Sequence, residues 1–188
     1  MGSPEKEISE QLELHHAESF GWALACCSRN REEAEAVLQR TYLKVLSGKA
    51  RYHGKSSFRT WLFSVIRRTA IDDRRTGFLR RLIVENLPPL VKSISQPDES
   101  LYTRELRDCI GVAMNGLPKR QKEVLFLVFY HELSLAEAAQ VMGVSKGTAH
   151  RHYERAKNGM RDRLEALKID ESTGRSKDSG TVSAIEAG

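Results

Sequence analysis

The stretch Ser134 to Arg155, SLAEAAQVMGVSKGTAHRHYER, decides the fold because it has the spacing of a helix-turn-helix. In its first half, apolar residues recur at i, i+3, i+4 and i+7, which is the period of one helix face. These residues are Leu135, Ala138, Ala139 and Met142. Ser134 and Glu137 form a capping box at the start of this helix, and Gly143 supplies the positive φ of a sharp turn. We therefore predict a short helix that ends at a tight turn.

A second helix follows, capped by Ser145. Its apolar residues step by three or four, at Ala149, Tyr153, Ala156, Met160, Leu164 and Leu167. The opposite side carries Lys146, Gly147, His150, Arg151, Glu154 and Arg155. Such a face suits the DNA major groove, where Arg and Lys contact base edges or neutralise phosphates. The alternative is a surface helix whose charges are only solvated.

The rest of the chain indicates two small helical domains of a cytoplasmic protein. Residues 85–100, ENLPPLVKSISQPDES, hold three of the five prolines and predict a linker. The tail beyond about Asp170 has few large apolar residues, which predicts disorder. The longest apolar run, Val124 to Tyr130, is too short to span a bilayer and predicts a core helix. Cys26, Cys27 and Cys109 lack disulfide or zinc spacing and are interpreted as core residues. The alternative is redox or metal sensing by Cys26 and Cys27 with the neighbouring His15 or His16.

Charge is segregated along the chain, although the net charge is only +5. Residues 5–45 carry eight acidic and five basic side chains, a balance of −3, whereas residues 51–81 carry nine basic and two acidic side chains, a balance of +7. A dense basic stretch favours polyanions through counterion release, so we expect it to contact nucleic acid and the acidic stretch to meet another partner.

Two amphipathic helices are predicted in the N-terminal half. The first spans residues 31–46, with a buried stripe formed by Ala34, Val37, Leu38, Thr41, Tyr42, Val45 and Leu46. The second spans residues 57–75, buries Phe58 and Trp61 and carries several arginines. The loop between them, residues 52–57, mixes an aromatic ring, Gly54, a cation and hydroxyls. Such a loop can accept an unstacked base; a plain connector is the alternative.

Taken together, three segments resemble the extracytoplasmic-function (ECF) sigma factors of bacterial RNA polymerase, in order and spacing. They are REEAEAVLQRTYLKVL, YHGKSSFRTWLFSVIRRTAIDDRR and LPKRQKEVLFLVFYHELSLAEAAQVMGVSKGTAHRHYERAKNGMRDRL. The resemblance implies an all-α fold, in which a region 2 helical bundle and a region 4 helix-turn-helix are joined by a flexible linker. We expect region 2 over residues 8–80, the linker over 81–104, region 4 over 105–169 and a disordered tail over 170–188.

The resemblance also implies where the partners bind. Region 2 would bind the clamp helices of the polymerase largest subunit through Glu32, Glu33, Glu35, Gln39, Tyr42 and Leu43. It would contact the promoter minus-10 element through His53, Gly54, Lys55, Ser56, Ser57, Arg59, Arg67, Arg68, Arg74 and Arg75. Region 4 would contact the polymerase flap and read the minus-35 element through Ser145, Lys146, Gly147, Thr148, His150, Arg151, Glu154 and Arg155. An anti-sigma factor is the expected inhibitor.

The sequence departs from the family pattern at several of these positions. Ala36 and Arg40 stand where acidic residues are common, and His150 and Arg151 occupy recognition-helix positions often held by Lys and Ser. Promoter specificity therefore cannot be transferred from relatives.

A promoter-specificity subunit is the predicted function, with no catalytic residue, metal, cofactor or small-molecule substrate and no membrane insertion. The second hypothesis is a helix-turn-helix repressor or activator that binds duplex DNA without polymerase. An enzyme has little support, because Asp72 and Asp73 point in different directions on a helix and no phosphate-binding glycine loop occurs. His150 and His152 likewise diverge, so they are poor joint metal ligands.

Overall fold

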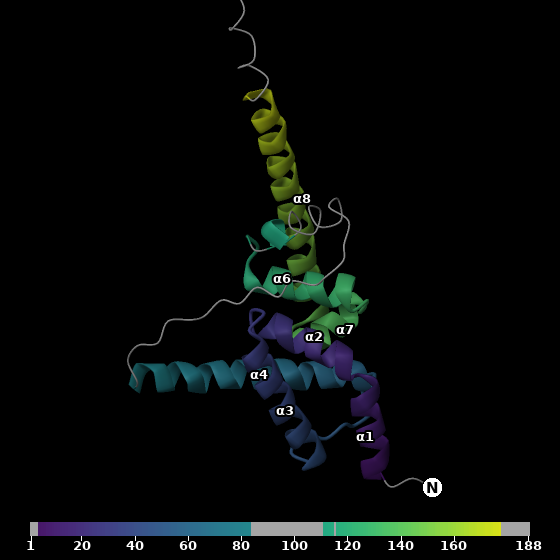
Figure 1. Cartoon of the computed structure of the whole chain (residues 1–188). Coiled ribbons are helices and arrows are strands. Elements are labelled where there is room, and N and C mark those ends of the chain that lie inside the picture. The colour runs from purple at the N-terminus through teal and green to yellow at the C-terminus, as the bar shows by residue number, and fades with distance from the viewer. Residues whose placement is uncertain (1–3, 84–110, 115, 178–188) are drawn as a thin grey trace, which may run out of the picture. The chain divides into compact units, whose positions relative to one another are not determined.

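The computed structural model describes residues 4–83, 111–114 and 116–177, and every regular element in that part of the chain is helical (Figure 1). The N-terminal elements are α1 (Pro4–Leu14), α2 (His16–Cys26), α3 (Arg31–Leu46) and α4 (Phe58–Ile83). The later elements are α6 (Lys119–Leu125), the π-helix η1 (Phe126–Tyr130), α7 (Leu135–Met142) and α8 (Lys146–Lys177). The all-α prediction is confirmed for the described residues.

Local chemistry sets the helix ends. The Asn30 side chain accepts a hydrogen bond of 3.2 Å from the backbone N–H of Glu33 and so caps α3. The Ser134 hydroxyl accepts from Glu137 N–H at 3.3 Å, while the Glu137 carboxylate accepts from Ser134 N–H at 3.0 Å, which confirms the capping box of α7. Gly143 ends α7 with φ of 66°, as predicted.

Compactness divides the chain into two units, one formed by residues 1–95 with 123–150 and the other by residues 96–122 with 151–188. In the first unit, α2, α3 and α4 pack against one another, α1 packs on α2 and α3, and α7 packs on α4. The segment predicted as region 4, residues 105–169, is thus shared between the two units.

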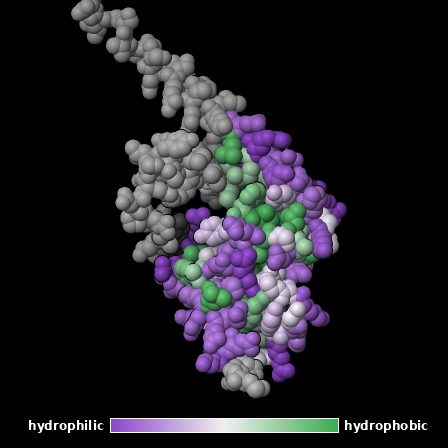
Figure 2. All heavy atoms as spheres, turned by 90° about the vertical axis from the view of Figure 1, so that its right-hand side faces the viewer, coloured by the Kyte–Doolittle hydropathy of each residue, from purple (hydrophilic) through white to green (hydrophobic). Residues whose placement is uncertain are grey.

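The core of the first unit lies between α2 and α4. Trp22 is buried, and its indole N–H donates to the Phe63 carbonyl at 3.0 Å. The Phe63 ring lies with its centroid 6.0 Å from that of Trp22, and Leu62 and Ile66 are fully buried beside it along α4. Large apolar side chains at helical spacing thus stabilise the bundle by burial. Elsewhere, on the face drawn in Figure 2, apolar side chains gather in the middle and hydrophilic ones surround them.

In the second unit, Arg163 of α8 donates to the Gly116 carbonyl at 2.7 Å and to the Gly159 carbonyl at 3.2 Å. A Cβ at Gly159 would lie 2.8 Å from the Leu117 side chain, so the absence of a side chain permits this close approach.

Several sequence expectations need correction. The second N-terminal helix does not end at residue 75, because α4 continues to Ile83 and includes the first three residues of the predicted linker. Helix α8 continues to Lys177 and so overlaps the first residues of the predicted tail. Leu46, expected on the buried stripe of α3, is 54% exposed. Residues 84–110 and 178–188, with Cys109 and most of the linker, lie outside the described residues.

The segment Val124 to Tyr130 is a core element only in part. Val124, Leu125 and Leu127 are buried, but Phe129 and Tyr130 are each 66% exposed. The wider turn of η1, which follows α6 directly, shifts the side-chain period away from the 3.6-residue repeat on which the prediction rested.

Candidate nucleic-acid interface

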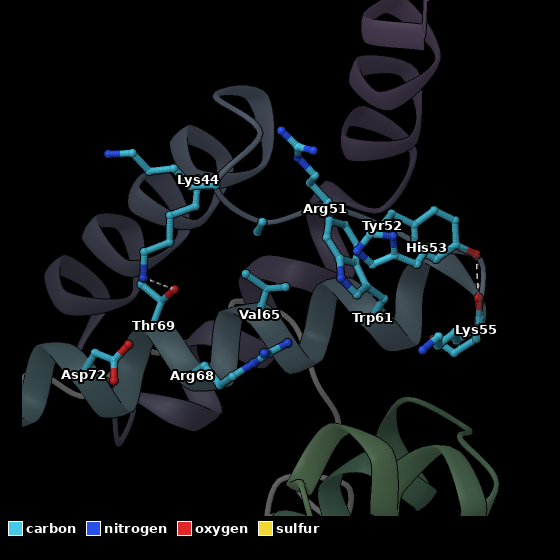
Figure 3. Close-up of a pocket in the computed structure, with 13 residues that line it drawn as sticks. Lys44, Arg51, Tyr52, His53, Lys55, Trp61, Val65, Arg68, Thr69 and Asp72 are labelled. Carbon is cyan, nitrogen blue, oxygen red and sulfur yellow. Dashed lines mark hydrogen bonds between the residues drawn. The ribbon is translucent and has the colours of Figure 1, made fainter.

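A pocket of about 600 Å³ opens between the end of α3, the loop 47–57 and one face of α4 (Figure 3). The loop reaches the α4 surface through two left-handed glycines, Gly48 with φ of 71° and Gly54 with φ of 68°. The Tyr52 hydroxyl donates to the Ser56 carbonyl and closes the loop on itself. The size of the pocket suits a small organic group such as a nucleotide base.

Aromatic rings form one wall of the pocket. Tyr52, Phe58 and Trp61 make a cluster with centroid separations of 5.2 to 5.4 Å, and Tyr52 and Trp61 line the pocket. Phe58 and Trp61 are only partly buried, so the expectation that both are simple core residues is wrong. An aromatic face beside open solvent can stack on a base.

Positive charge dominates the remainder of the lining. Five cationic side chains line the pocket, against the single carboxylate of Asp72: they are Lys44, Lys49, Arg51, Lys55 and Arg68. Lys44 donates to the Thr69 hydroxyl at 3.1 Å, which holds its ammonium group at the α4 side (Figure 3). This charge balance favours an anion such as a phosphate backbone.

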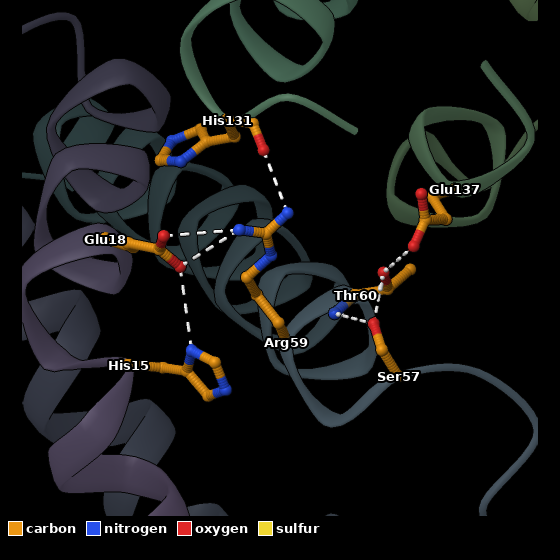
Figure 4. Close-up of polar contacts among 7 residues, drawn as sticks. All are labelled: His15, Glu18, Ser57, Arg59, Thr60, His131 and Glu137. Carbon is orange, nitrogen blue, oxygen red and sulfur yellow. Dashed lines mark hydrogen bonds and ion pairs between the residues drawn. The ribbon is translucent and has the colours of Figure 1, made fainter. Parts of the chain in front are cut away.

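The predicted minus-10 residues separate into two groups. His53, Lys55, Ser56 and Arg68 line the pocket, and Gly54 and Ser57 belong to the same loop. Arg59 and Arg67 lie elsewhere: Arg59 donates to the Glu18 carboxylate at 3.2 Å (Figure 4), and Arg67 pairs with Glu123. Arg74 donates to the Ala70 carbonyl at 3.2 Å, and Arg75 is exposed. Neither of these two arginines lines the pocket.

Sequence reasoning missed several lining residues. Lys44 and Lys49 stand at the end of α3 and beyond it, and Trp61, Thr69 and Asp72 come from α4. The spacing of Trp61, Val65, Arg68 and Asp72 by three or four residues is a signal for one helix face. Because this face carries both apolar and charged residues, the apolar pattern alone assigned Trp61 to the core.

The second candidate surface is the exposed side of the helix-turn-helix. The Ser145 hydroxyl accepts from Thr148 N–H at 3.2 Å and caps α8, as predicted. Lys146, Gly147, His150, Arg151 and Arg155 are exposed on α8. Glu154 is partly buried and pairs with Lys157 at 3.3 Å.

The predicted polymerase-binding side chains lie on α3. Glu32, Glu33, Glu35, Gln39 and Leu43 are exposed, and Tyr42 is partly buried. Tyr42 hydrogen-bonds His16 at 3.1 Å, and burial raises the pKa of its hydroxyl. Arg40, one of the departures from the family pattern, pairs with Asp73 of α4 at 2.8 Å and so fixes α3 on α4.

An apolar patch accompanies these acidic residues. Leu43 is 67% exposed, and Leu46 is 54% exposed one turn further along the same helix. Exposed leucines beside acidic groups form a surface that a helical protein partner can cover.

Cys26 and Cys27 are the cysteines within the described part of the chain. Cys26 and Cys27 are buried free thiols, and burial raises the pKa of both, that of Cys27 to about 11. Among the described residues, no group of histidine, cysteine and carboxylate side chains has the geometry to hold a metal ion. These observations agree with the interpretation of Cys26 and Cys27 as core residues.

Comparison with known proteins gives consistent matches. The family description "Sigma-70 region 2" matches residues 12–77, and "Sigma-70, region 4" matches residues 107–158. The chain is 28% identical over 128 residues to the RNA polymerase sigma factor YlaC of Bacillus subtilis, covering 67% of this chain and 74% of that protein. It is also 28% identical over 145 residues to the ECF RNA polymerase sigma factor SigX of the same organism, covering 74% and 75%.

A solved structure has a similar fold. The sigma factor RpoE of Bartonella quintana, crystallised with the anti-sigma factor NepR, superposes with a TM-score of 0.68 at 22% identity, covering 85% of this chain and 98% of that chain.

Within the described residues, no helix combines the length and the apolar run needed to cross a bilayer.

Proposed function

The chain belongs to the sigma-70 family as a sigma factor of the ECF type, and from this premise we propose that it directs core RNA polymerase to specific promoters and opens their minus-10 element. The observation that carries the proposal is the presence, in one chain, of an aromatic cationic pocket and a capped helix-turn-helix. The first suits separated strands and the second suits duplex DNA.

At the minus-10 element, the pocket would hold an extruded base. Trp61 and Tyr52 offer ring faces for stacking, while Lys55 and Arg68 neutralise adjoining phosphates. Stacking on an aromatic side chain contributes about 1 to 3 kcal/mol per base, which offsets part of the unstacking cost. Opening of the duplex thus requires binding energy and no bond chemistry, so we propose that the protein is not an enzyme.

At the minus-35 element, the N-terminal turns of α8 would enter the major groove. Lys146, His150 and Arg151 are exposed there, on a helix whose start is fixed by the Ser145 cap. A capped, rigid helix holds side chains at defined base edges, which is the requirement for sequence recognition.

Further protein partners are proposed for α3 and for region 4. We propose that the exposed acidic side chains and Leu43 bind the clamp helices of the polymerase largest subunit. Region 4 would contact the flap. We further propose a cytoplasmic protein inhibited by an anti-sigma factor, as the RpoE of Bartonella quintana was crystallised with NepR.

In vitro transcription from a genomic promoter library, with bacterial core polymerase and the full chain, tests the proposal. New start sites that share a minus-35 and minus-10 pair are the expected result. Tight duplex binding by the chain alone, without co-elution with core polymerase or new starts, would instead establish a stand-alone regulator.

A single variant tests whether α8 contacts the bases of the minus-35 element. If Arg151 contacts a base, Arg151→Ala should reduce the free energy of binding to a matched promoter by about 1 to 3 kcal/mol, seen as weaker transcription from it. The control is Arg161→Ala, which removes an exposed cation further along α8. Equal losses for both variants, or equal losses on unrelated DNA, would show that Arg151 contributes only charge.

A further inference from the structure

A second pocket, of about 390 Å³, adjoins the first on the α1 side of the loop 47–57. Ile8 of α1, Val45 of α3 and Gly48 line this second pocket alone. Five residues line both pockets, and we call them the shared wall: Ala50, Arg51, Tyr52, His53 and Trp61. Figure 3 shows Tyr52, His53 and Trp61 grouped together, at the opposite end of the first pocket from Asp72. The aromatic part of the first pocket therefore also borders the second.

The two pockets differ in charge. Four of the cations that line the first pocket do not line the second: Lys44, Lys49, Lys55 and Arg68. Among the described residues, the second pocket has Arg51 as its one cationic lining residue and has no carboxylate. The Arg51 Nε donates to the Gly48 carbonyl at 3.2 Å, which holds this side chain against the loop. A phosphate therefore favours the first pocket, whereas the second suits a flat, uncharged group.

Aromatic rings of the shared wall are fixed in place and reachable from solvent. Tyr52 and Trp61 lie with their centroids 5.4 Å apart and their planes inclined by 51°. The Tyr52 hydroxyl donates to the Ser56 carbonyl, although Tyr52 remains 38% exposed. Stacking of a base on an aromatic ring tolerates any base, because every base has a π-face. Rings that border two pockets can therefore take part in stacking in each of them.

A base held in the first pocket constrains the base next to it in the strand. Stacked bases lie about 3.4 Å apart, and a side chain inserted between them unstacks the pair. The neighbouring base then has one face without a stacking partner. The second pocket lies directly across the shared wall and offers ring faces together with the apolar side chain of Ile8. Binding there would replace part of the stacking that the strand has lost.

We propose that the second pocket binds the base adjacent to the extruded base, so that the shared wall separates two successive bases of one strand. The inference rests on the proposed function, because it requires a base in the first pocket. It adds α1, through Ile8, to the DNA-binding surface, although no residue of α1 was predicted to contact DNA. Because the lining that the second pocket adds is apolar, this pocket recognises a base by shape and stacking.

Synthetic DNA strands that carry very few bases test the proposal on the full chain. Each strand has about 12 nucleotides, which is within the usual site size for single-stranded DNA. Abasic sites replace all the bases, all but one, all but two successive bases, or all but two bases that flank an abasic site. Because the four strands carry the same phosphate charge, competition against a labelled oligonucleotide, followed by fluorescence anisotropy, reports the contribution of the bases alone.

One base should bind more tightly than none, and two successive bases should bind about fivefold to tenfold more tightly than one. Two bases that flank an abasic site should bind like a single base, because the second base then does not lie directly across the shared wall. No gain from the second successive base would overturn the proposal. An equal gain from the two separated bases would also overturn it, since the two positions would then not be adjacent.

Variants of α1 assign the gain to the second pocket. Ile8→Trp fills that pocket and should abolish the gain from the second successive base, while single-base binding stays unchanged. Leu14→Trp is the matched control and should change neither, because Leu14 is 71% exposed on the same helix and lines neither pocket. Ile8→Ala, which adds no bulk, should reduce the gain and keeps the test decisive if Ile8→Trp disturbs the packing of α1. A full gain in both Ile8 variants, or an equal loss in Leu14→Trp, would overturn the proposal.

Failure of the proposed function gives a different result in the same assay. If a single base adds nothing to the affinity of the abasic strand, the first pocket holds no base, and both proposals fail. If a single base is bound but its neighbour adds nothing, the second pocket alone is rejected and the role of the first pocket at the minus-10 element stands.

Discussion

Arginine side chains have different environments on the two faces of α4. Arg68 is exposed, folds back onto Ser64 with hydrogen bonds of 3.0 and 3.2 Å, and lines the open pocket. Arg67, the next residue, is buried and paired with Glu123. Neighbouring arginines of one helix therefore have different environments and different roles. Because consecutive residues are rotated by about 100° around an α-helix, one arginine serves the surface and its neighbour serves the packing.

The largest difference between the two faces should appear on truncation of each arginine. Arg67→Ala leaves the Glu123 carboxylate buried without its partner, so we expect a loss of about 3 to 5 kcal/mol in the free energy of unfolding. Arg68→Ala removes an exposed side chain and should change it by no more than about 0.5 kcal/mol. Urea unfolding, followed by the fluorescence of Trp22 and Trp61, measures both, because both indoles belong to the first unit. Similar losses for the two variants would contradict the division of α4 into two faces.

The free energy of unfolding should also depend on pH, through His131, which packs against the buried face of α4. Burial lowers the pKa of its imidazole to about 4, against the opposing effect of Glu18, and Arg59 lowers it further. An unfolded chain would protonate this histidine near its ordinary pKa of about 6.5. Stability from the neutral ring is therefore fully present above about pH 6.5 and is lost as the pH falls toward 4. We expect a loss of about 2 kcal/mol across that window, seen in urea unfolding at a series of pH values.

His131→Phe provides the matching control, because an apolar ring of similar size cannot be protonated. Its unfolding should lose most of this pH dependence, whereas His150→Gln, at an exposed position of α8, should retain it. An unchanged pH profile in His131→Phe would assign the effect to other groups, of which Glu18 is nearest in the network.

The helix-turn-helix was predictable because its signals are local. Capping by Ser134 and Ser145 and the left-handed Gly143 each depend on residues within four positions of one another, and all three are confirmed. The bounds of α3 are also confirmed, for the same reason. The far end of α4 was not predicted, since the sequence after residue 75 loses its regular apolar period although the helix continues to Ile83.

The candidate sites were predictable only in part. The loop 52–57 was expected to accept a base, and the structure does place it beside an aromatic cationic pocket. The contributions of Lys44 and Lys49 depend on how the end of α3 meets α4, which no local pattern records. The docking of Glu123 on Arg67 joins residues 56 positions apart, and a single sequence carries no signal for such a pair.

On the open face, the aromatic wall should contribute more to binding than to folding. Trp61→Leu removes the ring that lines the pocket and should weaken binding of single-stranded DNA by about 1 to 2 kcal/mol, or roughly tenfold. Phe58→Leu is the control, because Phe58 belongs to the same aromatic cluster but does not line the pocket. Fluorescence anisotropy of a labelled oligonucleotide gives both affinities. An equal loss in the two variants would show that the cluster acts only by shaping the loop.

The smallest expected effect concerns the charge of the open face, and its diagnostic is salt dependence. Arg68→Ala should weaken binding of single-stranded DNA by about 1 kcal/mol at low salt and reduce the slope of log affinity against log salt by about 0.7. The slope matters more than the affinity, because it counts the phosphate contacts that a side chain makes. Lys6→Ala, which removes an exposed cation at the start of α1, should leave the slope unchanged. A slope that stays constant in Arg68→Ala would mean that Arg68 contacts no phosphate, and the cationic lining would then shape the pocket without binding the DNA backbone.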